Sequence, residues 1–202
     1  MRCLLCHKEI GSDSMRDLLF RDDVLCASCR SDWQKAHRQY VFEGVKAEAL
    51  WIYEGGFRSC LIQYKERWDE ALAPVFLYPC RNEIRRKYHG CVFLLLPSSK
   101  RKREERGFSH LVQMIACTSL PWLEPFEMIE EMCQKGENPS GRRKMEKNIR
   151  LKEGIQLPHK ICLFDDTLTT GATMKGALRC LKEKKHVRIL TAGISLENVE
   201  KM

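Results

Sequence analysis

The chain has 202 residues, of which 44% are hydrophobic and 31% charged, and its formal net charge is +8. This length allows one sizeable core, or one core with a small satellite module, and the composition excludes wholesale disorder. The longest uninterrupted apolar run, residues 91–96, is too short to cross a bilayer. The opening MRCLLCHKEIG lacks the long apolar core of a signal peptide. We therefore expect a cytoplasmic protein without a transmembrane segment.

The positive charge is concentrated rather than spread evenly along the chain. Residues 81–106 hold nine basic and three acidic residues, and a further basic block follows at residues 142–152. A local excess of this kind favours an anionic partner such as phosphate groups, nucleic acid or a lipid surface. A solvated surface that aids solubility would give the same pattern, so charge alone leaves both interpretations open.

Four of the eleven cysteines form two pairs, CLLC (Cys3 and Cys6) and CASC (Cys26 and Cys29). Each pair places two thiolates on one tight turn, and two such turns together suit tetrahedral zinc. A module of roughly 40 residues buries little apolar surface, so a metal could supply on the order of 10 kcal/mol of folding free energy instead. Disulfides or a redox pair are the alternatives, and His7 could substitute as a ligand. Because four sulfurs complete the tetrahedral coordination of the metal and leave no position for a catalytic water, we expect structural zinc.

The residues after the second cysteine pair predict a linker helix. Trp33, Ala36 and Tyr40 recur at helical spacing behind a polar residue that could cap the helix. We therefore divide the chain into a zinc-binding module with its linker helix, residues 1–46, and a main domain, residues 47–202.

Strand and helix patterns alternate through the main domain. Short, continuously apolar runs are typical of strands covered on both faces, and amphipathic segments separate them. This order predicts an α/β fold with an open parallel sheet, in which ligands bind at the carboxyl ends of the strands. The predicted strands are residues 49–53, 91–97, 160–164 and 187–196, and the predicted helices are residues 57–78, 108–119 and 174–185.

The stretch ICLFDDTLTTGAT, residues 161–173, places two carboxylates and a hydroxyl-rich turn at the end of a predicted strand. Gly171 permits the close backbone approach that a phosphate requires, and the helix that follows offers unpaired amides. Asp165 and Asp166 would repel that phosphate, so they fit sugar hydroxyls or a magnesium ion on the same ligand. The predicted ligand is a ribose 5-phosphate, although an ordinary strand–turn–helix with a capping threonine would share the pattern.

The same stretch resembles the phosphoribosyl pyrophosphate (PRPP) motif of type I phosphoribosyltransferases: four apolar residues, two acids, and a threonine- and glycine-rich turn. The resemblance implies that the two acids are the catalytic pair, that they contact the ribose hydroxyls, and that the turn wraps the 5-phosphate. It also implies Mg²⁺ bound together with PRPP. The PRPP-binding residues would then be Asp165, Asp166, Thr169, Thr170, Gly171, Ala172 and Thr173.

The four-cysteine module followed by such a domain resembles the ComF family of competence proteins. WIYEGGFRSCLIQYKERWDEALA (residues 51–73) and LLLPSSKRKREERGFSH (residues 94–110) are similar to segments of that family. The chain departs from it at residues 96–99, where the family has Pro-x-Pro, and at Ser109, where the family has Asn. The resemblance implies a competence factor for the uptake of transforming single-stranded DNA, with that DNA and a helicase-like competence protein as partners. Partners could hold it at the inner face of the membrane.

An active phosphoribosyltransferase would also need positive charge for the leaving pyrophosphate and a positioned acceptor. No segment of the sequence announces an acceptor site, so three functions stay open: a PRPP-binding module, an active transferase, and a degenerate scaffold for a helicase-like partner. The residues assigned to the pyrophosphate side are Ser98, Ser99, Lys100 and Arg106. The basic residues assigned to nucleic acid, whose contacts would weaken with salt, are Arg101, Lys102, Arg103, Arg142, Arg143 and Lys144.

Overall fold

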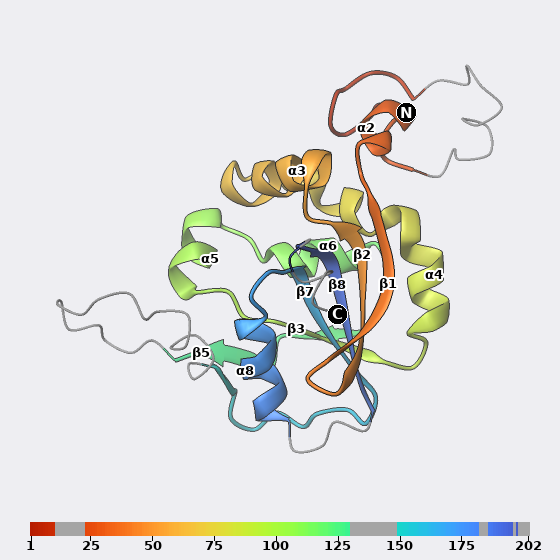
Figure 1. Cartoon of the computed structure of the whole chain (residues 1–202). Coiled ribbons are helices and arrows are strands. Elements are labelled where there is room, and N and C mark those ends of the chain that lie inside the picture. The colour runs from red at the N-terminus through yellow and green to blue at the C-terminus, as the bar shows by residue number, and fades with distance from the viewer. Residues whose placement is uncertain (11–22, 130–148, 182–185, 196, 198–202) are drawn as a thin grey trace.

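A computed structural model of the chain shows a mixed α/β molecule built on one six-stranded sheet (Figure 1). It describes residues 1–10, 23–129, 149–181, 186–195 and 197. The strand order is β1-β2-β8-β7-β3-β4, in which β1 and β2 are antiparallel and the other neighbours run parallel. The predicted α/β fold with a mostly parallel sheet is therefore confirmed.

The strands and helices have the following bounds. The strands are β1 (Lys35–Phe42), β2 (Val45–Ile52), β3 (Val92–Leu95), β4 (Trp122–Leu123), β5 (Phe126–Met128), β6 (Ile149–Leu151), β7 (Ile161–Leu168) and β8 (Val187–Ile194). The α-helices are α2 (Ala27–Ser31), α3 (Gly55–Glu66), α4 (Arg81–Lys87), α5 (Lys100–Arg106), α6 (His110–Ala116) and α8 (Ala172–Cys180), and the 3-10 helices are η1 (Glu70–Phe76) and η2 (Tyr78–Cys80). Strands β5 and β6 form a separate antiparallel ribbon.

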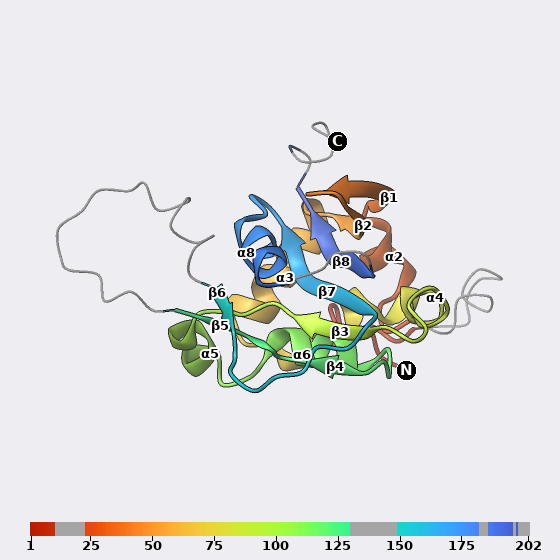
Figure 2. The same ribbon diagram turned by 90° about the horizontal axis from the view of Figure 1, so that it is seen from below.

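The central strands supply the core because their residues are apolar on both faces. Residues 161–164 of β7 and 189–190 of β8 are buried, as expected for inner strands of a parallel sheet. Helix α8 lies on one side of the sheet and α6 on the other, as the two views together show (Figures 1 and 2). None of the described helices combines the length and the apolar character needed to cross a membrane.

The predicted linker helix is wrong, because residues 35–42 form strand β1 of the main sheet. Glu43 and Gly44 both have positive φ, 50° and 79°, which is typical of a two-residue hairpin turn. Ala36 and Tyr40 are both buried. The pairing of β1 with β2 is irregular between Lys35 and Arg38, so strict alternation does not hold at Ala36, and a separation of four residues fits a helix as well as a strand. The sheet therefore begins before residue 47, whereas the division of the chain into two domains stays a prediction.

Two further helical segments differ from the sequence prediction. The helix expected over residues 57–78 ends at Glu66, and short 3-10 helices containing Pro74 follow. Helix α5 was not predicted, because KRKREER has no apolar residue that could reveal a periodic face. The signals that did mark it are its caps: the Ser99 hydroxyl accepts a hydrogen bond from the Lys102 amide, and Gly107 follows with a left-handed backbone.

Candidate functional site

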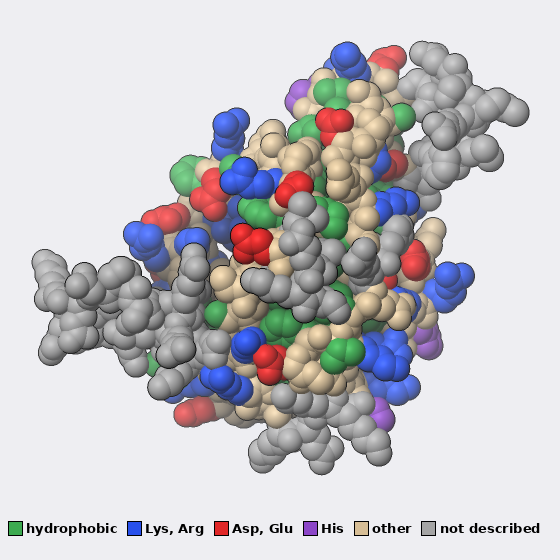
Figure 3. Space-filling model, in the orientation of Figure 1, with side chains coloured by type: hydrophobic (Ala, Val, Ile, Leu, Met, Phe, Trp, Pro, Cys, Tyr) green, Lys and Arg blue, Asp and Glu red, His purple; other side chains and the backbone are tan. Residues whose placement is uncertain are grey.

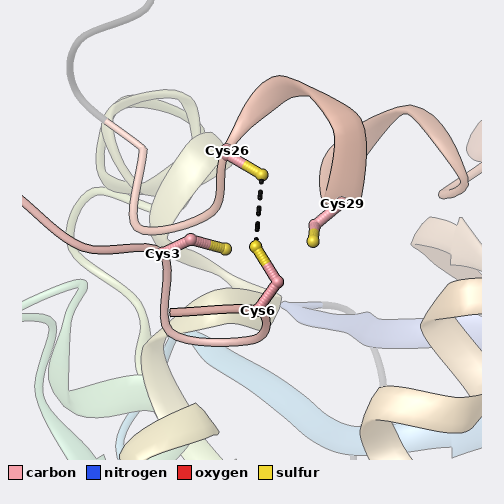
Figure 4. Close-up of side chains that lie close together, drawn as sticks. All are labelled: Cys3, Cys6, Cys26 and Cys29. Carbon is pink, nitrogen blue, oxygen red and sulfur yellow. Dashed lines mark hydrogen bonds between the residues drawn. The ribbon is translucent and has the colours of Figure 1, made fainter. Parts of the chain in front are cut away.

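The four patterned cysteines come together at the N-terminal end of the molecule, as the sequence predicts (Figure 4). Their sulfur atoms all lie within 4.8 Å of one another. The sulfurs of Cys6 and Cys26 are 3.7 Å apart, well beyond the about 2.05 Å of a disulfide bond, and the described cysteines are free thiols. The group could hold a metal ion, which is compatible with structural zinc.

Arg30, in α2, ties this cysteine group to the main sheet. Its Nε and Nη2 donate hydrogen bonds to Asp23 at 2.8 and 2.7 Å, and its Nη1 donates to the Val75 carbonyl at 3.0 Å. The guanidinium carbon lies 4.4 Å from the ring centroid of Trp33, which packs edge-on against Trp51. The geometry of the cysteine group is therefore coupled to the aromatic core through one side chain.

Strand β7 runs through the two acids that were expected at its end. It ends at Leu168 rather than Phe164, and Asp165 is in register with Thr191 of β8. Because successive side chains of a strand point to opposite faces, Asp165 and Asp166 diverge into different surroundings. The acidic pair is thus not a symmetrical one.

The Asp166 carboxylate lies in a buried polar network drawn from four elements. Its Oδ2 is 2.6 Å from His110 Nε2 and 2.7 Å from Lys65 Nζ. Arg106 Nη1 lies 2.7 Å from His110 Nδ1, and because a guanidinium only donates, Nδ1 accepts and the His110 proton resides on Nε2. Asp166 is 6% exposed and His110 5% exposed. The network fixes both the position and the hydrogen-bond partners of this carboxylate.

These surroundings give the two acids opposite charge states. Burial acts to raise the pKa of Asp166, but the Lys65 ammonium and the His110 hydrogen bond outweigh it and hold that pKa well below its ordinary value. Burial, together with the negative charge of Asp166, raises the pKa of Asp165 to about 8. Burial also lowers the pKa of His110, in agreement with a neutral ring. Near neutral pH, Asp166 is therefore the ionised acid and Asp165 is mostly protonated.

The raised pKa of Asp165 predicts that the chain loses stability as the pH rises from about 4 to about 8. In this window the folded chain keeps a proton that the unfolded chain releases, so the free energy of unfolding falls. Asparagine mimics the protonated acid. Asp165→Asn should therefore raise the Tm at pH 8.5 by about 2–4 °C, which corresponds to a gain of about 1 kcal/mol in the free energy of unfolding for a chain of this size. Scanning calorimetry at pH 4 and pH 8.5 measures this, and an equal shift at both pH values would contradict it.

The turn after β7 has the geometry that the sequence predicts for a strand-to-helix connection. Gly171 has a φ of 70° and directly precedes α8, and Thr169 and Thr170 are exposed. A hollow of about 190 Å³ opens beside this turn, and its lining includes Asp166, Thr169 and Lys65. The structure thus brings Asp166 and Thr169 together, whereas the lining of this hollow does not include Asp165, Thr170, Gly171, Ala172 or Thr173.

The residues assigned to the pyrophosphate side fall into two groups. Ser98 and Lys100 line a hollow of about 340 Å³ at the carboxyl end of β3, and His110 lines it too. Ser99 instead caps α5, and Arg106 is only 7% exposed behind His110. His110 therefore lies between the two hollows, because it lines the larger one and is hydrogen-bonded to the Asp166 of the smaller one.

The basic residues assigned to nucleic acid are partly described. Arg101 and Lys102 are exposed on α5, where Arg101 lies 3.6 Å from Glu105. Lys100 and Arg103 face Glu104 and Glu124 at 3.8 and 3.1 Å, so carboxylates compensate much of the charge of this helix. Arg142, Arg143 and Lys144 lie outside the described residues.

Sequence reasoning missed Lys65 and His110. The histidines of the chain show no ligand or triad spacing, so the sequence does not mark His110 as a site residue. Both residues reach Asp166 only through the fold, across 101 and 56 positions of sequence. The sequence carries no spacing signal for contacts between such distant segments.

Comparisons with known proteins agree with the family resemblance. No protein-family model matches the chain. The competence protein ComFC of Streptococcus pneumoniae is 28% identical over 91% of this chain and 94% of its own length. The competence protein ComFC of Bacillus subtilis is 26% identical over 90% of this chain and 89% of its own length. These similarities support a role in competence and membership of the ComF family of competence proteins.

Proposed function

We propose that this chain is a competence factor for the uptake of transforming single-stranded DNA, and that it binds PRPP or a related phosphorylated ribose through the β7–α8 site. The observation that carries the proposal is that Asp166, paired with Lys65, lines one hollow together with Thr169 near the carboxyl end of a parallel strand, in the segment that leads into α8. Ligands of open parallel sheets bind at this edge.

The turn and α8 would receive the 5-phosphate. The first amides of α8 lack intrahelical partners, and the helix dipole favours an anion at that end. The exposed hydroxyls of Thr169 and Thr170 add hydrogen bonds to the phosphate oxygens. The Phe42 ring packs against Gly171 on the side where a β-carbon would lie, so the ligand would meet the backbone amides of the turn from another side.

Asp166 would hold a ribose hydroxyl beside this phosphate. A hydrogen bond from a hydroxyl to a charged acceptor is worth about 1.5–3 kcal/mol. The His110 and Lys65 contacts are both made to Oδ2, so they orient the carboxylate for a ligand on its other side. Pyrophosphate would occupy the hollow of Ser98 and Lys100, and Mg²⁺ bound with PRPP would neutralise charge there.

Isothermal titration with PRPP and Mg²⁺ tests the proposal. Asp166→Asn should weaken PRPP binding by about 10- to 100-fold, because it removes the charged acceptor. Glu83→Gln is the matched control, since it also removes one negative charge but lies on exposed α4, and it should bind like the wild type. Thr169→Val provides a second test that leaves the buried network in place. Absence of binding, or equal binding by all variants, would refute the PRPP site.

Phosphoribosyl transfer is a second candidate, favoured by the hollow that adjoins His110 on the pyrophosphate side. In that reaction the bond from the ribose C1 to pyrophosphate breaks and a bond from C1 to an acceptor forms. Assaying pyrophosphate release with and without single-stranded DNA distinguishes an enzyme from a binding module. If PRPP neither binds nor reacts, the third function, a scaffold for a helicase-like partner, is favoured instead.

A further inference from the structure

A second set of hollows lies at the opposite edge of the sheet from Asp166. The larger, about 430 Å³, opens beside the amino ends of β7 and β8 and the turn between β1 and β2. A neighbouring hollow of about 350 Å³ shares Lys46, Lys87 and Arg188 with it, so the two form one groove. We call this surface the basic groove. Its lining lies at the amino ends of β7 and β8, whereas Asp166 and Thr169 lie near the carboxyl end of β7.

The charge of the basic groove is almost entirely positive. Among the described residues of its lining, Glu48 is the only acid; it pairs with Lys87 at 2.7 Å and also accepts a hydrogen bond from the Tyr88 hydroxyl. Lysine, arginine and histidine side chains gather at this end of the molecule, at the lower right of Figure 3. The cationic and histidine residues of the lining are Lys46, Lys87, His89, Lys160, His186 and Arg188.

Three of these cations have no acidic partner in the part of the chain that the structure describes. Lys46, Lys160 and Arg188 are exposed, and no described carboxylate forms an ion pair with them. Arg188 is nevertheless held in place, because its Nη1 donates a hydrogen bond to the Lys87 carbonyl at 3.1 Å. A fixed cation loses less side-chain entropy when it binds a phosphate than a free one does.

The basic groove is better suited to nucleic acid than α5, where Lys100, Arg101 and Arg103 each face a carboxylate. Its cations are spread over two adjoining hollows, which favours an extended polyanion over a single phosphate. Each hollow has the size of a small-molecule site, which suits the single nucleotides of a flexible strand better than a rigid double helix. Tyr88 in the lining is buried and offers no stacking surface, so recognition relies on phosphates rather than bases.

We infer that the basic groove binds the phosphate backbone of single-stranded nucleic acid. The inference rests on the proposed role in DNA uptake and moves the contact away from α5 and residues 142–144. Since the groove and the hollow of Asp166 share no lining residue, neither ligand has to displace the other.

Fluorescence anisotropy with a labelled oligothymidylate strand tests the basic groove. Contacts from the three unpaired cations should make the wild type lose about 20-fold in affinity between about 50 and 200 mM salt. Lys46→Glu/Lys160→Glu reverses two exposed, unpaired cations and should weaken binding at least about tenfold at about 100 mM salt, with a shallower salt dependence. Arg58→Glu/Arg67→Glu makes the same change of net charge at exposed residues of and beside α3, and it should bind like the wild type.

Further measurements on the same proteins decide the outcome. Lys46→Glu/Lys160→Glu should have the same circular dichroism spectrum and the same PRPP affinity as the wild type. If the wild type itself does not bind PRPP, the proposed function fails, but the strand-binding measurement still tests the basic groove. The inference is overturned if this variant binds the strand normally, or if Arg101→Glu/Lys102→Glu on α5 loses binding instead. It is also overturned if a duplex binds as tightly as the single strand, or if inorganic pyrophosphate alone occupies the groove and the strand does not.

Discussion

Cys29→Ser is expected to abolish zinc binding and to unfold the N-terminal module, the largest effect that we expect from one side chain. Metal binding in such small modules supplies on the order of 10 kcal/mol of folding free energy, and three remaining sulfurs would not close the site. Arg30 couples the module to Trp33, so the near-ultraviolet circular dichroism of the aromatic core should change as well. Elemental analysis of the purified protein gives the zinc content.

Cys117→Ser is the matched control for that substitution. Cys117 is a half-buried thiol outside the cysteine group, and its sulfur donates a hydrogen bond to the Met114 carbonyl. Its replacement should leave the zinc content and the aromatic spectrum unchanged. A Cys29→Ser protein that retains both properties, or a wild type that holds no zinc when zinc is supplied, would contradict a structural metal site.

Lys65→Met is expected to lower the free energy of unfolding by about 3 kcal/mol at pH 7, since it leaves the buried Asp166 carboxylate without its ammonium partner. Urea unfolding measures the loss. The pKa of Asp166 is lowered in the folded chain, so its stabilising contribution is present above about pH 4 and disappears as the pH falls further. The difference between wild type and variant should therefore shrink in acid.

Two further variants separate this effect from a general loss of charge. Lys175→Met removes the lysine of an exposed pair with Glu43, and it should cost less than about 0.5 kcal/mol. Lys65→Met/Asp166→Asn removes both charges of the buried pair and should recover part of the stability lost in Lys65→Met. Equal losses for Lys65→Met and Lys175→Met would mean that the buried network contributes no more than a surface ion pair.

The parts of the molecule that could be predicted from sequence are those whose signal is local. The two cysteine pairs and the strand–turn–helix around Gly171 are each defined by a few consecutive residues, and the structure shows both. The buried β-strands could be predicted for the same reason, because a short apolar run is enough to mark them. The Asp166 network could not, since Lys65 and His110 reach the carboxylate only after the sheet has formed.

Two errors arose where one pattern fits two structures. The separation of four residues between Ala36 and Tyr40 fits a helix as well as a strand, and only the turn at Glu43 and Gly44 decides between them. The length of β7 depends on its neighbour, because pairing with β8 continues to Leu168 and so carries the strand past both acids. Pairing between distant strands is a property of the fold that no local pattern reports.

Phe42, at the tip of the β1–β2 hairpin, rests directly on the backbone of Gly171. A β-carbon at position 171 would lie only 2.6 Å from the Phe42 ring, and the φ of 70° would strain any other residue there. The residue types at positions 42 and 171 therefore constrain each other. A larger residue at position 171 would require a smaller residue than phenylalanine at position 42. The β1–β2 hairpin therefore helps to determine the conformation of the turn before α8.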